Sequence, residues 1–215
     1  MNIILYGPPG SGKGTQGNIL GKKFNLLKVS TGDLLRDEIK KKTALGLKIS
    51  SDIDKGKLIS NDIINDLIEK VLSDKKYANR FIFDGYPRNL NQAKNIDMML
   101  ERNNQKISCV ISLKIEKEII LKRILGRQIC SKCGLIFNEF FNVPKAEEYE
   151  CKHELLKRSD DNEVSVNNRF DSYIKETNPI LNYYKERRTL YEINGSKEIN
   201  EINQQICDII QSLET

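Results

Sequence analysis

The stretch that most constrains this chain lies at residues 3–16, where an apolar run leads into a turn rich in glycine. The run Ile3–Tyr6 predicts a buried strand, and the residues after the turn have helical spacing. A turn of this kind lets backbone N–H groups converge on an anion, and the helix start adds partial positive charge. The stretch therefore predicts a phosphate-binding loop.

The spacing Gly7-x4-Gly12-Lys13 fits the P-loop motif with one departure. The general motif places Ser or Thr directly after the lysine, whereas here Gly14 intervenes and the hydroxyl follows at Thr15. The alternative is a glycine-rich turn that binds nothing, and the lysine in register after a strand disfavours it. We expect the phosphates of a nucleoside triphosphate to be held by Gly10, Ser11, Gly12, Lys13, Gly14 and Thr15.

The rest of the chain alternates between strand and helix patterns. Strand-like runs at 26–30, 80–84, 107–113 and 190–194 follow the first strand and are separated by segments with helical spacing. Five strands alternating with helices predict an α/β protein with a doubly wound parallel sheet, whose ligands lie at the carboxyl ends of the strands. Asn61 or Asp62 is expected to cap one helix, and Pro179 to break another.

Composition narrows the class of protein. Of 215 residues, 39% are hydrophobic and 30% charged, which is typical of a globular protein with a substantial core. The net charge of +5 is small and dispersed, so it favours polyanionic small substrates over nucleic acid. Neither a run long enough to span a bilayer nor a charged-then-apolar leader occurs, so we expect a cytoplasmic protein without membrane contact.

Charged residues at the predicted strand ends indicate phosphoryl transfer. Asp84 ends its strand one strand away from the P-loop, where a carboxylate holds Mg²⁺ through water. Arg88 follows at a distance suited to a second phosphate, because a guanidinium matches phosphate oxygens in pairs. His153 is the only histidine, which disfavours base catalysis by histidine. Further arginines fall at turns and helix edges: Arg36, Arg123, Arg127, Arg158 and Arg169.

Taken in order, these motifs resemble the adenylate kinases of the long-lid type, from Met1 to the last helix. The residues that carry the resemblance are Gly7–Thr15, Ser30–Arg36, Phe81–Arg88 with Gln92, Arg123-x3-Arg127, Arg158-x-Asp160-Asp161 and Arg169. The departure at Gly14 is itself the form found in that family. Six motifs in one order make the resemblance highly specific.

The resemblance implies the reaction MgATP + AMP ⇌ 2 ADP. On the donor side, Lys13 and the loop amides hold the ATP phosphates, Arg123 stacks on the adenine and touches phosphate, and Asp84 orients the Mg²⁺ shell. The transferring phosphoryl group is met by Arg127, Arg158 and Arg169. The AMP site is lined by Thr31, Arg36, Ile59, Gly85, Arg88 and Gln92, with Arg36 and Arg88 on the phosphate and Gln92 on the base. Asp160 and Asp161 are expected to pair with lid arginines.

The same resemblance divides the chain into a core and two closing segments. The core comprises residues 1–29, 60–121 and 160–215. Residues 30–59 close over AMP, and residues 122–159 form a small β-rich lid over ATP. Closure keeps water from a phosphoryl donor that would otherwise be hydrolysed. A monomer that binds the nucleotides ATP, AMP and ADP, and not nucleic acid, is the expected state.

Three of the five cysteines form a group in the predicted lid. Cys130-x2-Cys133 is typical of the first half of a zinc knuckle, and Cys151 supplies a third ligand for structural Zn²⁺. The fourth ligand stays open between His153, which imidazole chemistry favours, and Glu148, which has the usual spacing. Three reduced cysteines without metal are the other interpretation.

Three alternative functions remain. A related nucleoside monophosphate kinase would use GTP as donor, or CMP or UMP as acceptor. A zinc-ribbon module that binds nucleic acid would use the cysteines and positive charge, but the P-loop would then be idle and aromatic side chains on a basic face are lacking. A regulatory triphosphate switch would hold or hydrolyse nucleotide without an acceptor.

Overall fold

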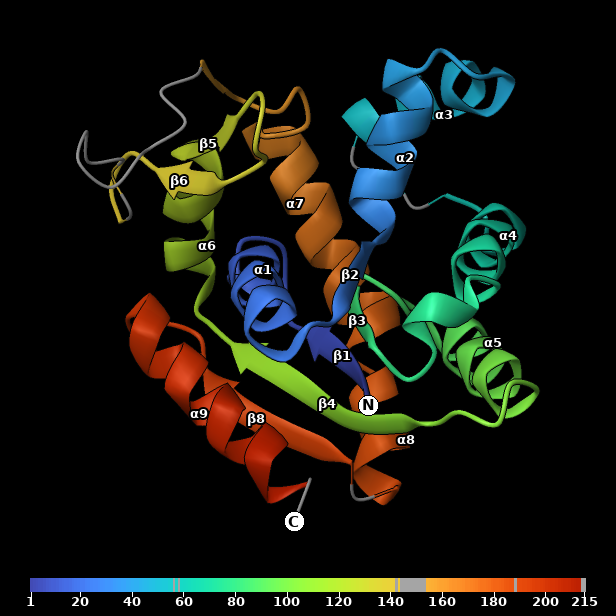
Figure 1. Ribbon diagram of the computed structural model, residues 1–215. Coiled ribbons are helices and arrows are strands. Elements are labelled where there is room, and N and C mark those ends of the chain that lie inside the picture. Colours follow the sequence, from blue (N-terminus) through green and yellow to red (C-terminus); the bar gives the residue numbers. More distant parts are fainter. Residues whose placement is uncertain (56, 58, 142, 144–153, 188, 214–215) are drawn as a thin grey trace.

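A five-stranded parallel sheet forms the centre of the computed structural model, which describes residues 1–55, 57, 59–141, 143, 154–187 and 189–213. The strand order is β2-β3-β1-β4-β8, and every neighbouring pair runs parallel. This confirms the predicted doubly wound α/β fold (Figure 1). The strands are β1 (Asn2–Tyr6), β2 (Leu27–Ser30), β3 (Phe81–Asp84), β4 (Ile107–Lys114) and β8 (Leu190–Asn194).

Helices connect the strands and extend from them. Within the described ranges, none of them is long and apolar enough to cross a membrane. The α-helices are α1 (Lys13–Phe24), α2 (Thr31–Lys40), α3 (Ala44–Asp54), α4 (Asn61–Leu72), α5 (Leu90–Glu101), α6 (Lys117–Leu125), α7 (Glu163–Ser172), α8 (Ile180–Glu186) and α9 (Ile199–Ser212). A 3₁₀ turn, η1 (Lys75–Tyr77), precedes β3, and a π-helical segment, η2 (Tyr173–Thr177), follows α7.

Both faces of the central strand β1 are buried, which explains why Ile3–Tyr6 is a continuous apolar run. Along β1, Ile4 and Tyr6 pack with α4, α5 and α8 on one face, while Ile3 and Leu5 pack with α1 and α9 on the other. Alternate side chains of a strand point to opposite faces, so one continuous apolar run serves two cores. The result is a three-layer sandwich that holds the carboxyl ends of the strands at one edge (Figure 1).

Two smaller units rise from that edge. Helices α2 and α3 follow β2, and a small antiparallel sheet of order β6-β5-β7 follows α6. Its strands are β5 (Arg127–Cys130), β6 (Ile136–Asn138) and β7 (Leu155–Leu156). In Figure 1 the two units lie on opposite sides of the space above α1. They belong to the segments 30–59 and 122–159 that the sequence predicts to be mobile.

Two details of helix ends bear on the sequence predictions. The predicted interruption at Pro179 is confirmed, because the π-helical η2 ends at Thr177 and Pro179 is the N-cap of α8. The predicted cap of α4 was wrong by one residue. Ser60 occupies the N-cap position and Asn61 is the first helical residue. The side chain of Asn61 is therefore not needed at the cap and contacts other side chains.

Candidate functional site

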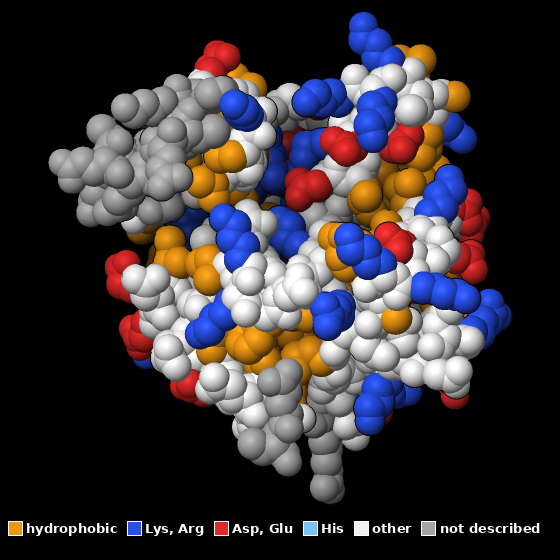
Figure 2. Space-filling model, viewed as in Figure 1, with side chains coloured by type: hydrophobic (Ala, Val, Ile, Leu, Met, Phe, Trp, Pro, Cys, Tyr) orange, Lys and Arg blue, Asp and Glu red, His pale blue; other side chains and the backbone are white. Residues whose placement is uncertain are grey.

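One cavity of about 410 Å³ opens at the carboxyl edge of the sheet, between α2 and the β5–β6 hairpin. Its volume lies in the range usual for small-molecule sites. Figure 2 shows Lys and Arg side chains gathered in the hollow between these two units. The structure brings every predicted nucleotide-site residue to the lining: Gly10, Ser11, Gly12, Lys13, Gly14, Thr15, Thr31, Arg36, Ile59, Asp84, Gly85, Arg88, Gln92, Arg123, Arg127, Arg158 and Arg169.

The glycine-rich loop leaves the first backbone N–H groups of α1 available to a ligand. Gly12 sits at the N-cap with φ 97°, a left-handed conformation that favours glycine, and no side chain caps the helix. The first turn of α1 contains no acidic residue. The Lys13 ammonium donates to the carbonyls of Gly7 (2.8 Å) and Pro8 (2.9 Å). An anion at this helix start would meet backbone donors and one cation.

The departure from the general P-loop motif has a steric reason. A Cβ atom at Gly14 would lie 3.3 Å from Cδ1 of Ile136 in β6 and 3.6 Å from a carboxylate oxygen of Asp84. A Thr or Ser there would crowd the small β-sheet above the loop. Gly14 therefore lets β6 approach the loop closely, and Thr15 brings its hydroxyl to the cavity one residue later.

Burial and like charge lower the pKa of several cations around the cavity. Burial, reinforced by Arg88, Arg127 and Arg169, lowers the pKa of Lys13 to about 8, although Asp84 opposes the shift. Burial, with Arg127 and Arg36 nearby, lowers the pKa of Arg158 to about 10. These cations repel one another in a partly desolvated space, so the cavity favours a ligand that carries several negative charges.

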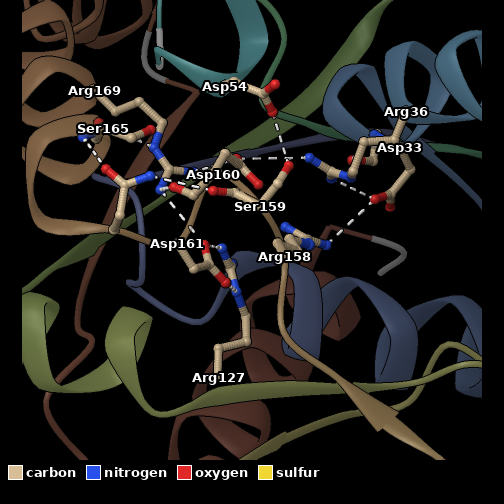
Figure 3. Close-up of polar contacts among 12 residues, drawn as sticks. Asp33, Arg36, Asp54, Arg127, Arg158, Ser159, Asp160, Asp161, Ser165 and Arg169 are labelled. Carbon is tan, nitrogen blue, oxygen red and sulfur yellow. Dashed lines mark hydrogen bonds and ion pairs between the residues drawn. The ribbon is translucent and has the colours of Figure 1, made fainter. Parts of the chain in front are cut away.

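Two adjacent aspartates hold part of this charge in place (Figure 3). Asp161 pairs with Arg127 of the predicted lid as expected, whereas Asp160 pairs with Arg169, which lies outside that segment. Arg127 donates from Nε to Oδ2 of Asp161 at 2.8 Å and makes a second bond to Oδ1. Arg169 donates from Nη1 to Oδ2 of Asp160 at 2.9 Å and lies 3.5 Å from Asp161. The Asp161 side chain is 1% exposed, so these are buried ion pairs rather than surface contacts.

Arg36 and Arg158 meet at Asp33, close to the aspartate pair (Figure 3). Arg36 donates to Asp33 at 2.6 Å and Arg158 at 3.4 Å. Burial raises the pKa of Asp33, but the Arg36 guanidinium outweighs it and brings the pKa to about 2. The Nε atom of Arg158 is buried without a hydrogen-bond partner among the described residues. An unsatisfied buried donor of this kind suits an anionic ligand.

The loop from Gly85 to Arg88 is fastened from several sides. The carbonyl of Gly85 accepts from the Thr31 hydroxyl and from Nε of Arg88, both at 2.8 Å. The Tyr6 hydroxyl donates to the carbonyl of Pro87 at 2.9 Å, and the Thr177 hydroxyl to that of Arg88 at 2.8 Å. Bonds from three separate elements thus fix the backbone that carries Arg88.

Arg123 lies under an aromatic side chain that the sequence did not single out. Its guanidinium carbon is 5.5 Å from the ring centroid of Phe141, and its Nη1 donates to the carbonyl of Gly195 at 2.8 Å. Asn138 in β6 donates to the carbonyl of Arg123 at 2.7 Å. Phe141 lines the cavity and is 49% exposed, so it offers a flat apolar face beside a cation.

Other residues that line the cavity were also not predicted from the sequence. Ser196 and Lys197 follow β8, and Tyr173 and Thr177 lie in the π-helical η2. The rule that ligands sit beyond the carboxyl ends of parallel strands could have pointed to Ser196 and Lys197. The π-helical segment carries no comparable sequence signal.

The residues between β7 and α7, and α7 itself, contact α2, α3 and the turn after α3. Ser159 donates to a carboxylate oxygen of Asp54 at 2.8 Å, and Arg158 reaches Asp33 (Figure 3). Asn168 in α7 donates to the carbonyl of Lys55 at 3.0 Å. These bonds join parts of the chain that lie more than 100 residues apart in sequence, and they close one side of the cavity.

The proposed metal ligands are only partly within the described residues. Cys130 ends β5 and is buried, and Cys133 lies in the turn before β6. The backbone N–H of Cys133 donates to Sγ of Cys130 at 3.4 Å. Cys151, His153 and Glu148 fall outside the described residues. Among the residues that are described, three or more metal-binding side chains do not gather at any point.

Comparison with known proteins gives one consistent result. A family model described as Adenylate kinase matches residues 5–189. The Adenylate kinase of Pelagibacter ubique strain HTCC1062 is 46% identical over 212 residues, which cover 98% of this chain and 100% of that protein. The Adenylate kinase of Methanocella arvoryzae is 41% identical over 215 residues, covering 99% and 100%. That of Clostridium botulinum strain Langeland is 39% identical over 212 residues, covering 98% of each chain.

The buried aspartate pair yields a stability prediction. We expect Asp161→Asn to lower the free energy of unfolding by about 3–5 kcal/mol, because Arg127 and Arg169 lose a buried counter-charge. Urea unfolding of both proteins measures the difference. Asp37→Asn is the matched control, since its ion pair with Lys41 is exposed (side chains 66% and 67%) and should change stability by less than about 1 kcal/mol. Equal losses in the two variants would contradict the prediction.

Proposed function

The chain belongs to the adenylate kinase family, and from this premise we propose how its cavity carries out the reaction of that family. The reaction is reversible phosphoryl transfer from MgATP to AMP, which gives two ADP. The observation that carries the assignment is that two groups of cations line one cavity, each suited to a phosphate. One surrounds Lys13 and the start of α1, and the other surrounds Arg36 and Arg88.

The donor half lies over the P-loop. Backbone N–H groups from Gly10 to Thr15 surround the β- and γ-phosphates, and Lys13 moves from its carbonyl partners to the phosphates. The adenine of ATP lies against Arg123 and Phe141. Support for this placement comes from the position of the Arg123 guanidinium carbon over the Phe141 ring, 5.5 Å from its centroid.

The acceptor half lies between α2 and the Gly85–Arg88 loop. Arg36 and Arg88 bind the AMP phosphate, while Thr31, Ile59, Gly85 and Gln92 surround the nucleoside. The fastening of the loop by Tyr6 and Thr177 supports this role, because a fixed backbone holds a guanidinium in one orientation. The apolar side of Ile59 faces the cavity, where a purine ring would pack.

Catalysis in this arrangement is positioning and charge stabilisation. The transferring phosphoryl group passes between the two halves, where Arg127, Arg158 and Arg169 reach its equatorial oxygens. Asp84 and the Thr15 hydroxyl are the residues that would hold Mg²⁺, which neutralises phosphate charge when bound. Their position beside Lys13 at the P-loop fits an oxygen-ligated cation.

Closure of two segments completes the site. We assign residues 30–59 to the part that closes over AMP, residues 122–159 to the lid over ATP, and the remainder to the core. The bonds Ser159–Asp54 and Arg158–Asp33 support this, since they form only when lid and AMP segment meet. Water excluded by this contact cannot compete with AMP for the phosphoryl group. A monomer in the cytoplasm, binding neither nucleic acid nor membrane, remains the prediction from the sequence.

The assay that tests the function offers a panel of nucleotides. With MgATP as donor, we expect AMP to be phosphorylated at least about tenfold more efficiently (kcat/KM) than CMP, UMP or GMP. Arg88→Lys should lower kcat/KM for AMP by about tenfold or more, because a point charge replaces a paired donor. Preference for CMP or UMP, or for GTP as donor, would indicate a related kinase. ATP hydrolysis without any acceptor would indicate a nucleotide switch.

A pH series tests the role of Lys13. Burial brings the pKa of Lys13 to about 8, and the negative charge of a bound phosphate would raise it again by stabilising the ammonium. The charged form binds ATP, so affinity is complete below pH 8 and falls as pH rises above it, by up to about tenfold per unit. Calorimetry between pH 7.5 and 9.5 measures this, with Lys13→Met as the control that should show no such slope. The same slope in both proteins would rule out Lys13 as the titrating group.

We also propose structural Zn²⁺ in the lid, held by Cys130, Cys133, Cys151 and either His153 or Glu148. The N–H to sulfur bond between Cys133 and Cys130 supports a knuckle that faces one ion. Glu154 is the residue that follows His153, and its carbonyl accepts from the backbone N–H of Ser131 at 3.0 Å. The chain thus returns beside the knuckle immediately after the second pair of candidate ligands.

Metal analysis tests the zinc proposal. We expect about one equivalent of zinc in protein purified without added metal, and well under one in Cys133→Ser, with a lower thermal midpoint. His153→Ala and Glu148→Ala then separate the two candidates, because only the true ligand should matter. Well under one equivalent in the unmodified protein would support the metal-free lid instead.

A further inference from the structure

The side-chain amide of Gln92 is fixed by its hydrogen bonds. Gln92 is 3% exposed and lines the acceptor half of the cavity. Its Oε1 accepts from the backbone N–H of Arg88 at 2.8 Å, and its Nε2 donates to Oδ1 of Asn61 at 2.8 Å. A backbone N–H can only donate, so the carbonyl end of this amide must face Arg88.

Asn61 is held in one orientation as well. Its Oδ1 also accepts from Nδ2 of Asn89 at 2.8 Å. Asn89 is the N-cap of α5, and its own Oδ1 accepts from the backbone N–H of Gln92 at 3.0 Å. The three amides therefore form a circuit that begins and ends on backbone N–H groups. Turning Gln92 or Asn89 by 180° would place donor against donor and acceptor against acceptor, and turning Asn61 would place its Nδ2 against two donors.

The circuit leaves part of the hydrogen-bonding capacity of the Gln92 side chain unused. A primary amide has two N–H donors and two acceptor lone pairs. Within the described part of the chain, one donor and one lone pair of Gln92 stay available to a ligand. Because the amide cannot turn, it presents these two in one spatial order only.

That order distinguishes two classes of purine. Adenine carries an amino donor at C6 beside the acceptor N1. A 6-oxopurine carries an acceptor at C6 beside the donor N1–H, which is the reverse order. A glutamine that could turn freely would satisfy either base, whereas a fixed one pairs with one class and opposes the other.

We propose that Asn61 and Asn89 determine acceptor-base specificity by holding the Gln92 amide in the orientation that matches adenine. The proposal rests on the assignment of this half of the cavity to AMP. Within the described residues, neither asparagine lines the cavity. They are positioning residues that act through Gln92. Asn61 is able to do so because Ser60, not Asn61, occupies the cap of α4.

The test compares AMP with inosine monophosphate, which differs at the base edge and not at the phosphate. Asn61→Leu removes the acceptor that Gln92 and Asn89 share, so that only the backbone N–H of Arg88 still opposes a half turn of the Gln92 amide. The ratio of kcat/KM for the two acceptors should fall about tenfold, the value of one buried hydrogen bond. Asn61→Asp is the matched control. Its carboxylate still accepts both bonds, so it should keep the ratio within about twofold of the unmodified protein. KM for ATP should be unchanged in both.

The outcomes distinguish failure of the proposed function from failure of the positioning role. If the unmodified protein does not phosphorylate AMP, the proposed function fails first. If it does, and a folded Asn61→Leu keeps the original ratio, the positioning role is overturned. Equal loss of the ratio in Asn61→Asp would overturn it too. Should Asn61→Leu not fold, Asn89→Asp decides the question. It keeps the cap acceptor of α5 but removes the donor to Asn61, and an unchanged ratio there overturns the proposal.

Discussion

Mutual repulsion among the cations of one cavity is the constraint on which the rest of the site depends. Lys13 and Arg88 lie near Arg127 and Arg169, and burial makes their charge costly to keep in water-poor surroundings. Asp160 and Asp161 neutralise part of it, as does Asp33, without filling the cavity. The positive charge that these carboxylates do not neutralise attracts phosphates and contributes to their binding energy. The buried cations repel one another, and the phosphates of two nucleotides would reduce that repulsion.

We expect closure of residues 30–59 and 122–159 over the cavity to depend on the same balance between cations and negative charges. The arginines come from different units: Arg36 from α2, Arg127 from β5, and Arg169 from α7. Bringing them together costs repulsion unless carboxylates and phosphates intervene. Arg158 reaches Asp33 and Ser159 reaches Asp54. Asp33 is also the carboxylate that pairs with Arg36, so one of these contacts uses a carboxylate that already neutralises a cation of the cavity. Binding of substrate charge and closing of the segments therefore reinforce each other.

Sequence patterns were sufficient to predict the sheet, the P-loop and the arginines that line the cavity. Each of these is encoded by residues close together in the sequence. The run Ile3–Tyr6 is apolar on both faces, and that alone predicts a strand covered twice. Phe141 could not be found, since it lies in an irregular segment without periodicity. Asn61 was expected at a helix cap because its residue type favours caps. Ser60 took that place, and only the tertiary structure shows Asn89 and Gln92 beside it.

Cations bind the phosphates and uncharged amides select the base, and this division explains why the hydrogen bonds of Gln92 matter. Arginines and Lys13 bind phosphate strongly, but every nucleoside monophosphate carries the same phosphate, so they cannot select a base. Selection has to come from groups whose donors and acceptors have a fixed order. A lone glutamine would not supply it, because a half turn of its amide exchanges donor and acceptor, so it could pair with either class of base. The backbone N–H of Arg88 restricts that freedom by a direct bond to Gln92, and the backbone N–H of Gln92 restricts it through Asn89 and Asn61. In the arrangement we propose, backbone N–H groups at the sheet edge thus orient the amide that meets the base, while the arginines bind the phosphates.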